Sequence, residues 1–220
     1  MIKSELDNYL GFDSSDLFID PLVRVFGGAV RDIICGDPIN DVDILCGSWS
    51  FPILKEILLS KGYHFHSGLS MRDIESLYSG ISVICEPHTF ISGDGKSVVQ
   101  LIRPRGHVHN DLPSYMKKDI YNKSYINLLR NVDISCCGVS WDGSNLYQNC
   151  QDSVLHCLKK VFVVNKNALM VTNRLVHRLI KLKDRGWVEF DSNDPNNRDL
   201  RISGILDVGC EIEIDFINEI

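Results

Sequence analysis

The sequence has no long apolar run and no export signal. No apolar stretch approaches the roughly 18 residues that a membrane-spanning helix requires, so we expect no membrane partner. The opening residues, MIKSELDNYL, carry acidic side chains early and lack the apolar region of a secretory signal. We therefore expect an intracellular, cytoplasmic protein.

Closely spaced cysteine pairs are also missing. The chain of 220 residues contains eight cysteines, and none of them forms a C-x-x-C pair. In a chain of this length without an export signal, reduced and mostly buried thiols are expected rather than a framework of disulfides.

An excess of basic residues is absent from the chain as a whole. The net charge is −6, which argues against attraction of nucleic acid to the entire surface. The charge is nevertheless uneven, because eight basic residues lie between Lys159 and Arg185 with one acid, Asp184. A local basic face could still contact a polyanion, although a solvated helix face explains the same pattern.

Apolar and turn-forming residues predict strands and helices that alternate to about residue 150, followed by a basic helical segment and an acidic tail. The sequence contains no internal repeat. The expected strands cover residues 22–26, 42–46, 81–86, 97–103, 137–141 and 145–149. The expected helices cover residues 29–35, 52–61, 114–130 and 167–185. The last of these has the clearest helical periodicity, with Leu175, Leu179 and Leu182 on one face and Arg174 and Arg178 on another.

Two adjacent glycines, Gly27 and Gly28, stand where the first expected strand meets the first expected helix. Glycines allow a phosphate to approach the backbone closely, because no Cβ is in the way. The amino terminus of the helix adds free N–H groups and partial positive charge. Arg31, in the first turn, could contact the same anion with two hydrogen bonds. The neighbouring Asp32 is better explained as a structural partner for an arginine or as a helix cap.

Asp41 and Asp43 flank Val42 at the start of the second expected strand. Alternation along a strand places both carboxylates on one face. Two like charges side by side are costly unless a cation neutralises them. Hard oxygen ligands of this kind suit Mg²⁺, or Mn²⁺, bound together with substrate phosphates. A glycine pair or a D-x-D alone is usually a turn or a solvated surface, but the two in this order indicate a site.

Residues 25–47, VFGGAVRDIICGDPINDVDILCG, resemble the head domain of class II CCA-adding tRNA nucleotidyltransferases and bacterial poly(A) polymerases, and more broadly the polymerase-beta nucleotidyltransferase superfamily. The resemblance implies an α+β fold, with a mixed sheet flanked by helices and a small helical C-terminal segment. It implies nucleotide at Gly27 and Gly28 and metal at Asp41 and Asp43. We expect a nucleotidyltransferase domain over residues 1–155 and a basic helical segment with an acidic tail over 156–220.

Two further blocks extend the resemblance. Residues 131–143, NVDISCCGVSWDG, are similar to a family segment in which an aspartate belongs to the nucleotide pocket, and this implies that role for Asp133. Cys137 stands where the family has asparagine. Alignment through Gly186 and Trp187 matches Arg174 to the arginine of the base-reading helix. Arg178 lies one turn later and is predicted, with Arg174, to bind nucleotide, on a helix face that could also contact phosphate or RNA.

A third carboxylate of the superfamily is expected on the strand at residues 98–102. The nearest polar residue there is Gln100, and Glu86 is the obvious stand-in. Two hypotheses follow. The first is a metal-dependent enzyme that uses two Mg²⁺ ions to transfer a nucleoside monophosphate from an NTP to an acceptor hydroxyl, with an RNA or tRNA 3′ end as the favoured acceptor. The second is a catalytically weak or inactive nucleotide-binding protein of the same fold, since the third carboxylate is missing.

Overall fold

The structure, a computed structural model, describes residues 1–68, 84–105, 132–148, 152–164, 173–191, 193, 195 and 212–213. The eight strands of its main sheet lie side by side in the order β10-β7-β6-β1-β2-β5-β4-β3. Their bounds are β1 Arg24–Phe26, β2 Val42–Leu45, β3 Tyr63–Gly68, β4 Ile84–Ser92, β5 Val98–Arg105, β6 Val139–Trp141, β7 Leu146–Gln148 and β10 Ile212–Glu213. The pair β2 and β5 is parallel and the other pairs are antiparallel.

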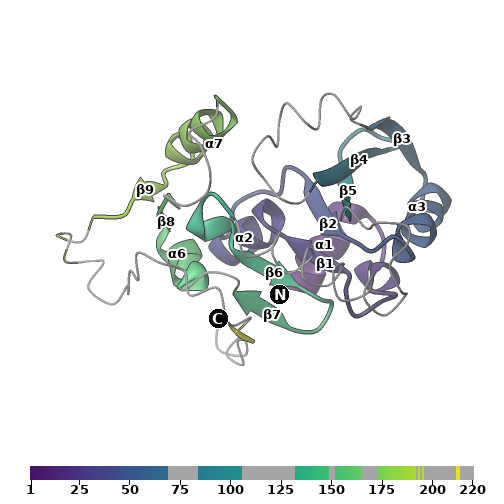
Figure 1. The fold of residues 1–220 in the computed structure, drawn as a ribbon, viewed down its shortest axis with the longest axis horizontal. Coiled ribbons are helices and arrows are strands. Elements are labelled where there is room, and N and C mark those ends of the chain that lie inside the picture. The colour runs from purple at the N-terminus through teal and green to yellow at the C-terminus, as the bar shows by residue number, and fades with distance from the viewer. Residues whose placement is uncertain are drawn as a thin grey trace, which may run out of the picture.

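Helices pack along this sheet and extend beyond one end of it. α3, next to β3, and α7 lie at opposite ends of the molecule (Figure 1). α6 packs against α2 and the short 3-10 helix η2, while the strands β8 and β9 form a separate parallel pair. The bounds are α1 Ile2–Leu10, η1 Ser14–Leu17, α2 Gly28–Cys35, α3 Ser50–Ser60, η2 Ser135–Cys137, α6 Ser153–Lys159, β8 Val161–Phe162, α7 Asn173–Asp184 and β9 Val188–Glu189. The expected α+β class and mixed sheet are confirmed.

The core follows the two periodicities of the sequence. On β2, Val42 and Ile44 are completely buried while Asp43 between them is half-buried, as alternation along a strand requires. On α3, Leu54 and Leu58 are completely buried one turn apart. These side chains join one apolar cluster that also includes residues of α1, α2, β5 and β6.

Several expected elements agree with the structure and others needed correction. The turns at SGDGK and at Asp142-Gly143 both connect antiparallel strands as expected. The first strand of the SGDGK hairpin, expected over residues 81–86, extends further than expected, because β4 continues through Pro87 to Ser92; residues 81–83 lie outside the described part of the chain. Pro87 lies just beyond the last pair with β3, Gly68–His88, so its missing N–H leaves that ladder intact. The sequence analysis missed α1 and β3.

Some expectations fall outside the described residues. The helix expected at 114–130 does so completely, and so do residues 167–172 of the last expected helix. The boundary expected between residues 155 and 156 falls inside α6, so the division into two domains stays a proposal. None of the described helices combines the length and apolar character that crossing a membrane requires.

Candidate nucleotide site

The turn between β1 and α2 requires glycine at its first position. Gly27 has φ 72° and ψ −126°, a backbone conformation that is costly for residues with a Cβ. Its N–H donates to the carbonyl of Val139 at 2.9 Å, and its carbonyl accepts from the N–H of Arg31 at 3.0 Å. A Cβ added at Gly27 would meet nothing within 4 Å. No side chain caps this end of α2, so its amino terminus is suited to an anion.

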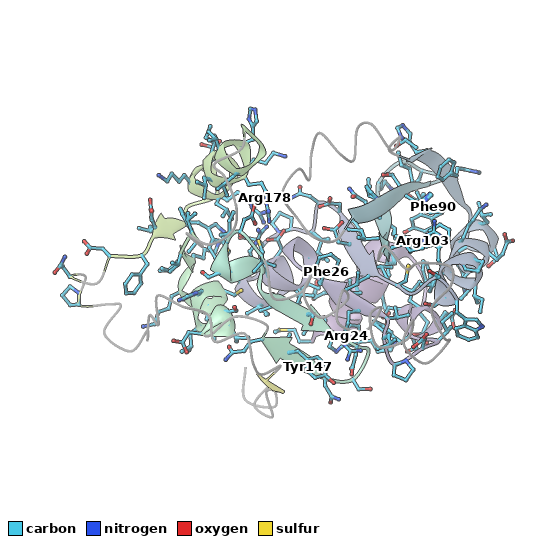
Figure 2. All side chains as sticks on the ribbon, viewed as in Figure 1. Arg24, Phe26, Phe90, Arg103, Tyr147 and Arg178 are labelled. Carbon is cyan, nitrogen blue, oxygen red and sulfur yellow. The ribbon has the colours of Figure 1, made fainter. Side chains whose placement is uncertain are left out.

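The two predicted carboxylates lie beside this turn. Asp43 on β2 is the direct partner of Phe26, the last residue of β1 before Gly27. Opposed Cα atoms in antiparallel strands are about 4.5–5.5 Å apart. Figure 2 shows Phe26 near the centre of the molecule. Asp41 comes two residues before Asp43, immediately before β2, and both are half-buried. The fold therefore brings the glycine turn and the D-x-D together.

Gln100 completes this group from the neighbouring strand. It pairs with Asp43 across the parallel strands β2 and β5. Its Nε2 donates to Oδ2 of Asp41 at 3.3 Å. The position beside Asp43 on β5, where a third carboxylate was expected, therefore carries an amide. Glu86 on β4 pairs with Arg103 on β5. Arg103 comes three residues after Gln100, so Glu86 lies about 10 Å further along the sheet than Gln100.

Arg31 is nearly buried and is held from two sides. Its Nε donates to Oδ1 of Asp32 at 2.7 Å, and its Nη1 donates to Sγ of Cys137 at 3.4 Å. Its guanidinium also lies 5.5 Å from the ring centroid of Trp187. A Cβ added at Gly28 would lie 3.8 Å from Nη2, so the positive charge is next to the glycine turn. Asp32 pairs with arginines, as the sequence predicted.

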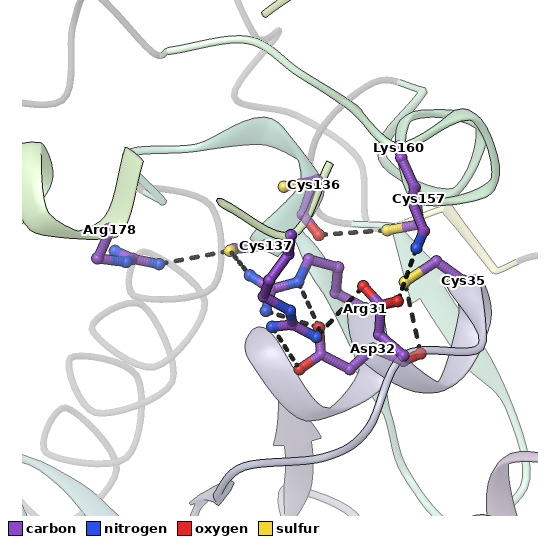
Figure 3. Close-up of polar contacts among 10 residues, drawn as sticks. Arg31, Asp32, Cys35, Cys136, Cys137, Cys157, Lys160 and Arg178 are labelled. Atoms are coloured by element: carbon purple, nitrogen blue, oxygen red, sulfur yellow. Dashed lines mark hydrogen bonds and ion pairs between the residues drawn. The ribbon is translucent and has the colours of Figure 1, made fainter. Parts of the chain in front are cut away.

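Asp133 and Arg178 meet although they come from different parts of the chain. Nη1 of Arg178, on α7, contacts both carboxylate oxygens of Asp133, with a distance of 2.6 Å to Oδ2. Nη2 of Arg178 donates to Sγ of Cys137 at 3.4 Å. Arg178, Cys137 and Arg31 thus form a continuous line of contacts (Figure 3). Arg174 lies one turn earlier on α7, and its side chain is outside the described part of the chain.

A second acidic group lies on the other side of Arg31 from Cys137. The ligand atoms of Asp32, Cys35 and Asp37 all lie within 4.8 Å of one another. Asp32 is already paired with Arg31 and Arg185. Asp37 is paired with Lys160 at 2.6 Å and with Arg185 at 3.3 Å. Burial raises the pKa of the Cys35 thiol to about 11, which keeps it protonated. This group does not fit a metal ion, because its negative charge is already compensated.

Sequence reasoning missed two residues that organise the site. Cys137 contacts both arginines, and Arg185 joins Asp32 to Asp37. The only signals were the Cys136-Cys137 pair and the last basic residue of the Lys159–Arg185 segment. Neither signal indicates a partner 106 or 153 residues away in the chain.

No family model matches the chain, and no curated protein matches it. Solved structures do. A CCA-adding enzyme in its apo form I is 15% identical, with a TM-score of 0.48 over 78% of this chain and 36% of that one. A tRNA-processing enzyme with CTP is 14% identical, with a TM-score of 0.48 over 88% of this chain and 44% of that one. The CCA-adding enzyme of Bacillus stearothermophilus in complex with CTP is 14% identical, with a TM-score of 0.38 over 86% and 39%. This chain thus spans less than half the length of each of these proteins.

Proposed function

We propose that this protein is a nucleotidyltransferase that transfers a nucleoside monophosphate from an NTP to an acceptor hydroxyl and releases pyrophosphate. The observation that carries the proposal is the pairing of Asp43 with the residue before Gly27. It brings two half-buried carboxylates to an uncapped helix amino terminus. Carboxylates beside a phosphate-binding turn are the elements that this reaction needs.

The donor set at the carboxylates fits Mg²⁺ or Mn²⁺. Asp41 and Asp43 offer carboxylate oxygens, and the amide of Gln100 lies against Asp41. Oxygen ligands supplemented by substrate phosphates suit these ions. When bound by Asp41 and Asp43, divalent metal ions would neutralise phosphate charge and activate the attacking hydroxyl. The group around Asp32 offers no comparable place, because arginine and lysine side chains already occupy it.

The protein's own residues would hold the nucleotide. The N–H groups at the start of α2 would donate to the phosphates, with Gly27 and Gly28 allowing the close approach. Arg31 is fixed beside Gly28 and would add positive charge to that site. Arg178 and Asp133 would contact the sugar or base from the side of α7. Arg174 would extend this contact surface by one turn of the same helix.

The acceptor that the chain supports best is RNA, such as a tRNA 3′ end. Lys181 and Lys183 on α7 are exposed, whereas Arg178 on α7 and Arg185 just after it are engaged with carboxylates. Lys183 also lies 4.0 Å from the exposed carboxylate of Glu189, a surface contact that contributes little. Both lysines would therefore serve phosphate contacts that are independent of sequence.

Incorporation of labelled nucleotide tests this proposal. Purified protein would be incubated with Mg²⁺, each labelled NTP and total RNA. We expect label on RNA from the wild type and none from the Asp41→Ala variant. Glu56→Gln, which removes an exposed acid on α3, is the matched control and should keep full incorporation. Equal incorporation by wild type and Asp41→Ala would contradict the proposal.

The amide at Gln100 favours a second candidate, a nucleotide-binding protein without catalytic activity. An amide carries no negative charge to replace the expected third carboxylate, so charge neutralisation of a second ion is weaker. This candidate predicts that NTP with Mg²⁺ raises the melting temperature while no RNA, protein or small-molecule acceptor becomes labelled. If NTP changes the melting temperature under no condition, both candidates are wrong.

A further inference from the structure

The sulfur of Cys137 lies between two guanidinium groups. Nη1 of Arg31 and Nη2 of Arg178 each donate to it at 3.4 Å. The two arginines belong to different elements, α2 and α7, while Cys137 ends η2. Cys137 is almost completely buried, so its sulfur forms an internal contact between α2 and α7.

Charge counting assigns a role to this sulfur. Among the described residues, four cations, from Arg31, Arg178, Arg185 and Lys160, meet three carboxylates in two sets of ion pairs, and the sulfur of Cys137 connects the two sets. The carboxylates belong to Asp32, Asp37 and Asp133. Within the described residues, the set that contains Arg31, Arg185 and Lys160 therefore has one positive charge more than its carboxylates supply, and Arg31 in this set is buried, where such a charge is costly unless an anion compensates it. Cys137 lies between Arg31 and Arg178. Arg31 shares its carboxylate partner, Asp32, with Arg185, whereas Arg178 is paired with Asp133.

The thiol of Cys137 is suited to supply this charge. A hydrogen bond from the Cys136 side chain and the charges of Arg178 and Arg31 lower the pKa of Cys137 to about 5, although burial opposes the shift. Neighbouring thiols behave in the opposite way, since burial raises the pKa values of Cys136 and Cys157. With a thiolate at Cys137, acids and bases alternate along the whole series from Asp133 to Lys160.

We propose that Cys137 is a positioning residue. Its sulfur contacts the guanidinium groups of both Arg31 and Arg178 and so holds the two groups in the positions from which they bind the nucleotide. This inference rests on the proposed nucleotide site. Without the sulfur, each arginine keeps its carboxylate but loses the contact that joins α2 to α7 at this point. Nucleotide binding then has to restore the arrangement of two arginines, and the affinity falls.

Substitutions that separate charge from size test the inference. Affinity for ATP, CTP, GTP and UTP with Mg²⁺ would be measured by calorimetry. We expect Cys137→Ser, which is similar in size but neutral, to weaken binding about tenfold, and Cys137→Ala to weaken it at least as much, since both lose a charge-assisted contact to two guanidinium groups. Cys137→Asp restores a negative charge and should recover most of the affinity. The control is Cys46→Ser, because Cys46 is a buried thiol whose sulfur contacts the carbonyl of Ile102 on β5.

A spectroscopic signature accompanies the binding data and needs no nucleotide. The ultraviolet absorbance of a thiolate should be present in the wild type at neutral pH, absent in Cys137→Ser and unchanged in Cys46→Ser. Absence of this signal in the wild type would overturn the inference even if every variant at position 137 failed to fold.

The outcomes separate this inference from the proposed function. If the wild type binds NTP and both neutral variants bind equally well, the positioning role of Cys137 is wrong and the nucleotide site stands. If folded wild type binds none of the four NTPs, the proposed function fails and this inference fails with it.

Discussion

Two acidic regions of this protein, Asp41 and the group around Asp32, differ in how their charge is compensated. Asp32 lies in a series of ion pairs with arginine and lysine side chains. For Asp41, the described residues provide an amide contact from Gln100 and no ion pair. The difference distinguishes the acidic residues that stabilise the fold from those that can bind a ligand. A compensated carboxylate stabilises its neighbours, whereas an uncompensated one is ready for a metal ion.

The largest effect that would test this comparison is expected on stability at Asp32. Asp32→Asn leaves Arg31 and Arg185 largely buried with less negative charge, and should lower the free energy of unfolding by about 3 kcal/mol. Urea denaturation measures this. The control is Asp16→Asn, which removes an exposed pair with Lys61 and should cost less than about 1 kcal/mol. Equal small losses in both variants would contradict the structural role of Asp32.

Asp41→Asn should show the reverse pattern. Nucleotide incorporation should fall by about a hundredfold or more, because a ligand of the charge-neutralising ion is weakened. The free energy of unfolding in the absence of metal should be unchanged or slightly higher, since one of two adjacent like charges is removed. The same urea curves and the RNA-labelling assay measure both quantities. A large loss of stability would mean that Asp41 belongs to the framework.

Gln100→Glu tests the same comparison by adding a negative charge beside Asp41 and Asp43. A third carboxylate beside Asp43 should increase Mg²⁺ affinity and raise incorporation by about tenfold at limiting metal. Without metal the same change adds a like charge and should lower the melting temperature. Titration of Mg²⁺ against both incorporation and melting temperature tests this expectation. If Mg²⁺ fails to recover the lost stability, Gln100 does not face the metal site.

A smaller effect is expected from pH at Asp37. Burial raises the pKa of this carboxyl, but Cys35, Lys160 and Arg185 together hold it below its ordinary value. A lowered pKa means that the stabilisation is fully present above the unfolded value of about 3.9 and is lost as pH falls through the folded value. Asp37→Asn should therefore flatten the acid limb of the stability curve, because the substituted side chain no longer takes up a proton there. Unfolding curves below pH 5 for both proteins measure the difference.

The first half of the candidate site could be predicted because it is local in sequence. Gly27, Gly28, Asp41 and Asp43 lie within one strand–helix–strand unit, where spacing and alternation determine which groups meet. The alternation of buried Val42 and Ile44 with half-buried Asp43 follows directly from that pattern. The strand through Pro87 was missed because proline usually interrupts a strand, and only the strand order explains why this one is tolerated.

The second half could not be predicted, since it depends on contacts between distant segments. Arg31 and Cys137 are 106 residues apart, and Arg185 and Asp32 are 153 residues apart. Asp133 and Arg178 were each assigned to the nucleotide pocket, but nothing in their spacing indicates that they bind each other. Pairings of this kind follow from how helices pack, which the hydrophobic pattern of a single helix does not specify.

The parallel pairing of β2 with β5 has a consequence for how the protein folds. Asp41 and Gln100 are 59 residues apart, and α3, β3 and β4 lie between β2 and β5 in the chain, so the pairing of these two strands closes a long loop. Closing so long a loop is slow relative to forming the local hairpins. The glycine turn can therefore form early from its own segment, whereas the amide reaches the carboxylates only in a late step of folding.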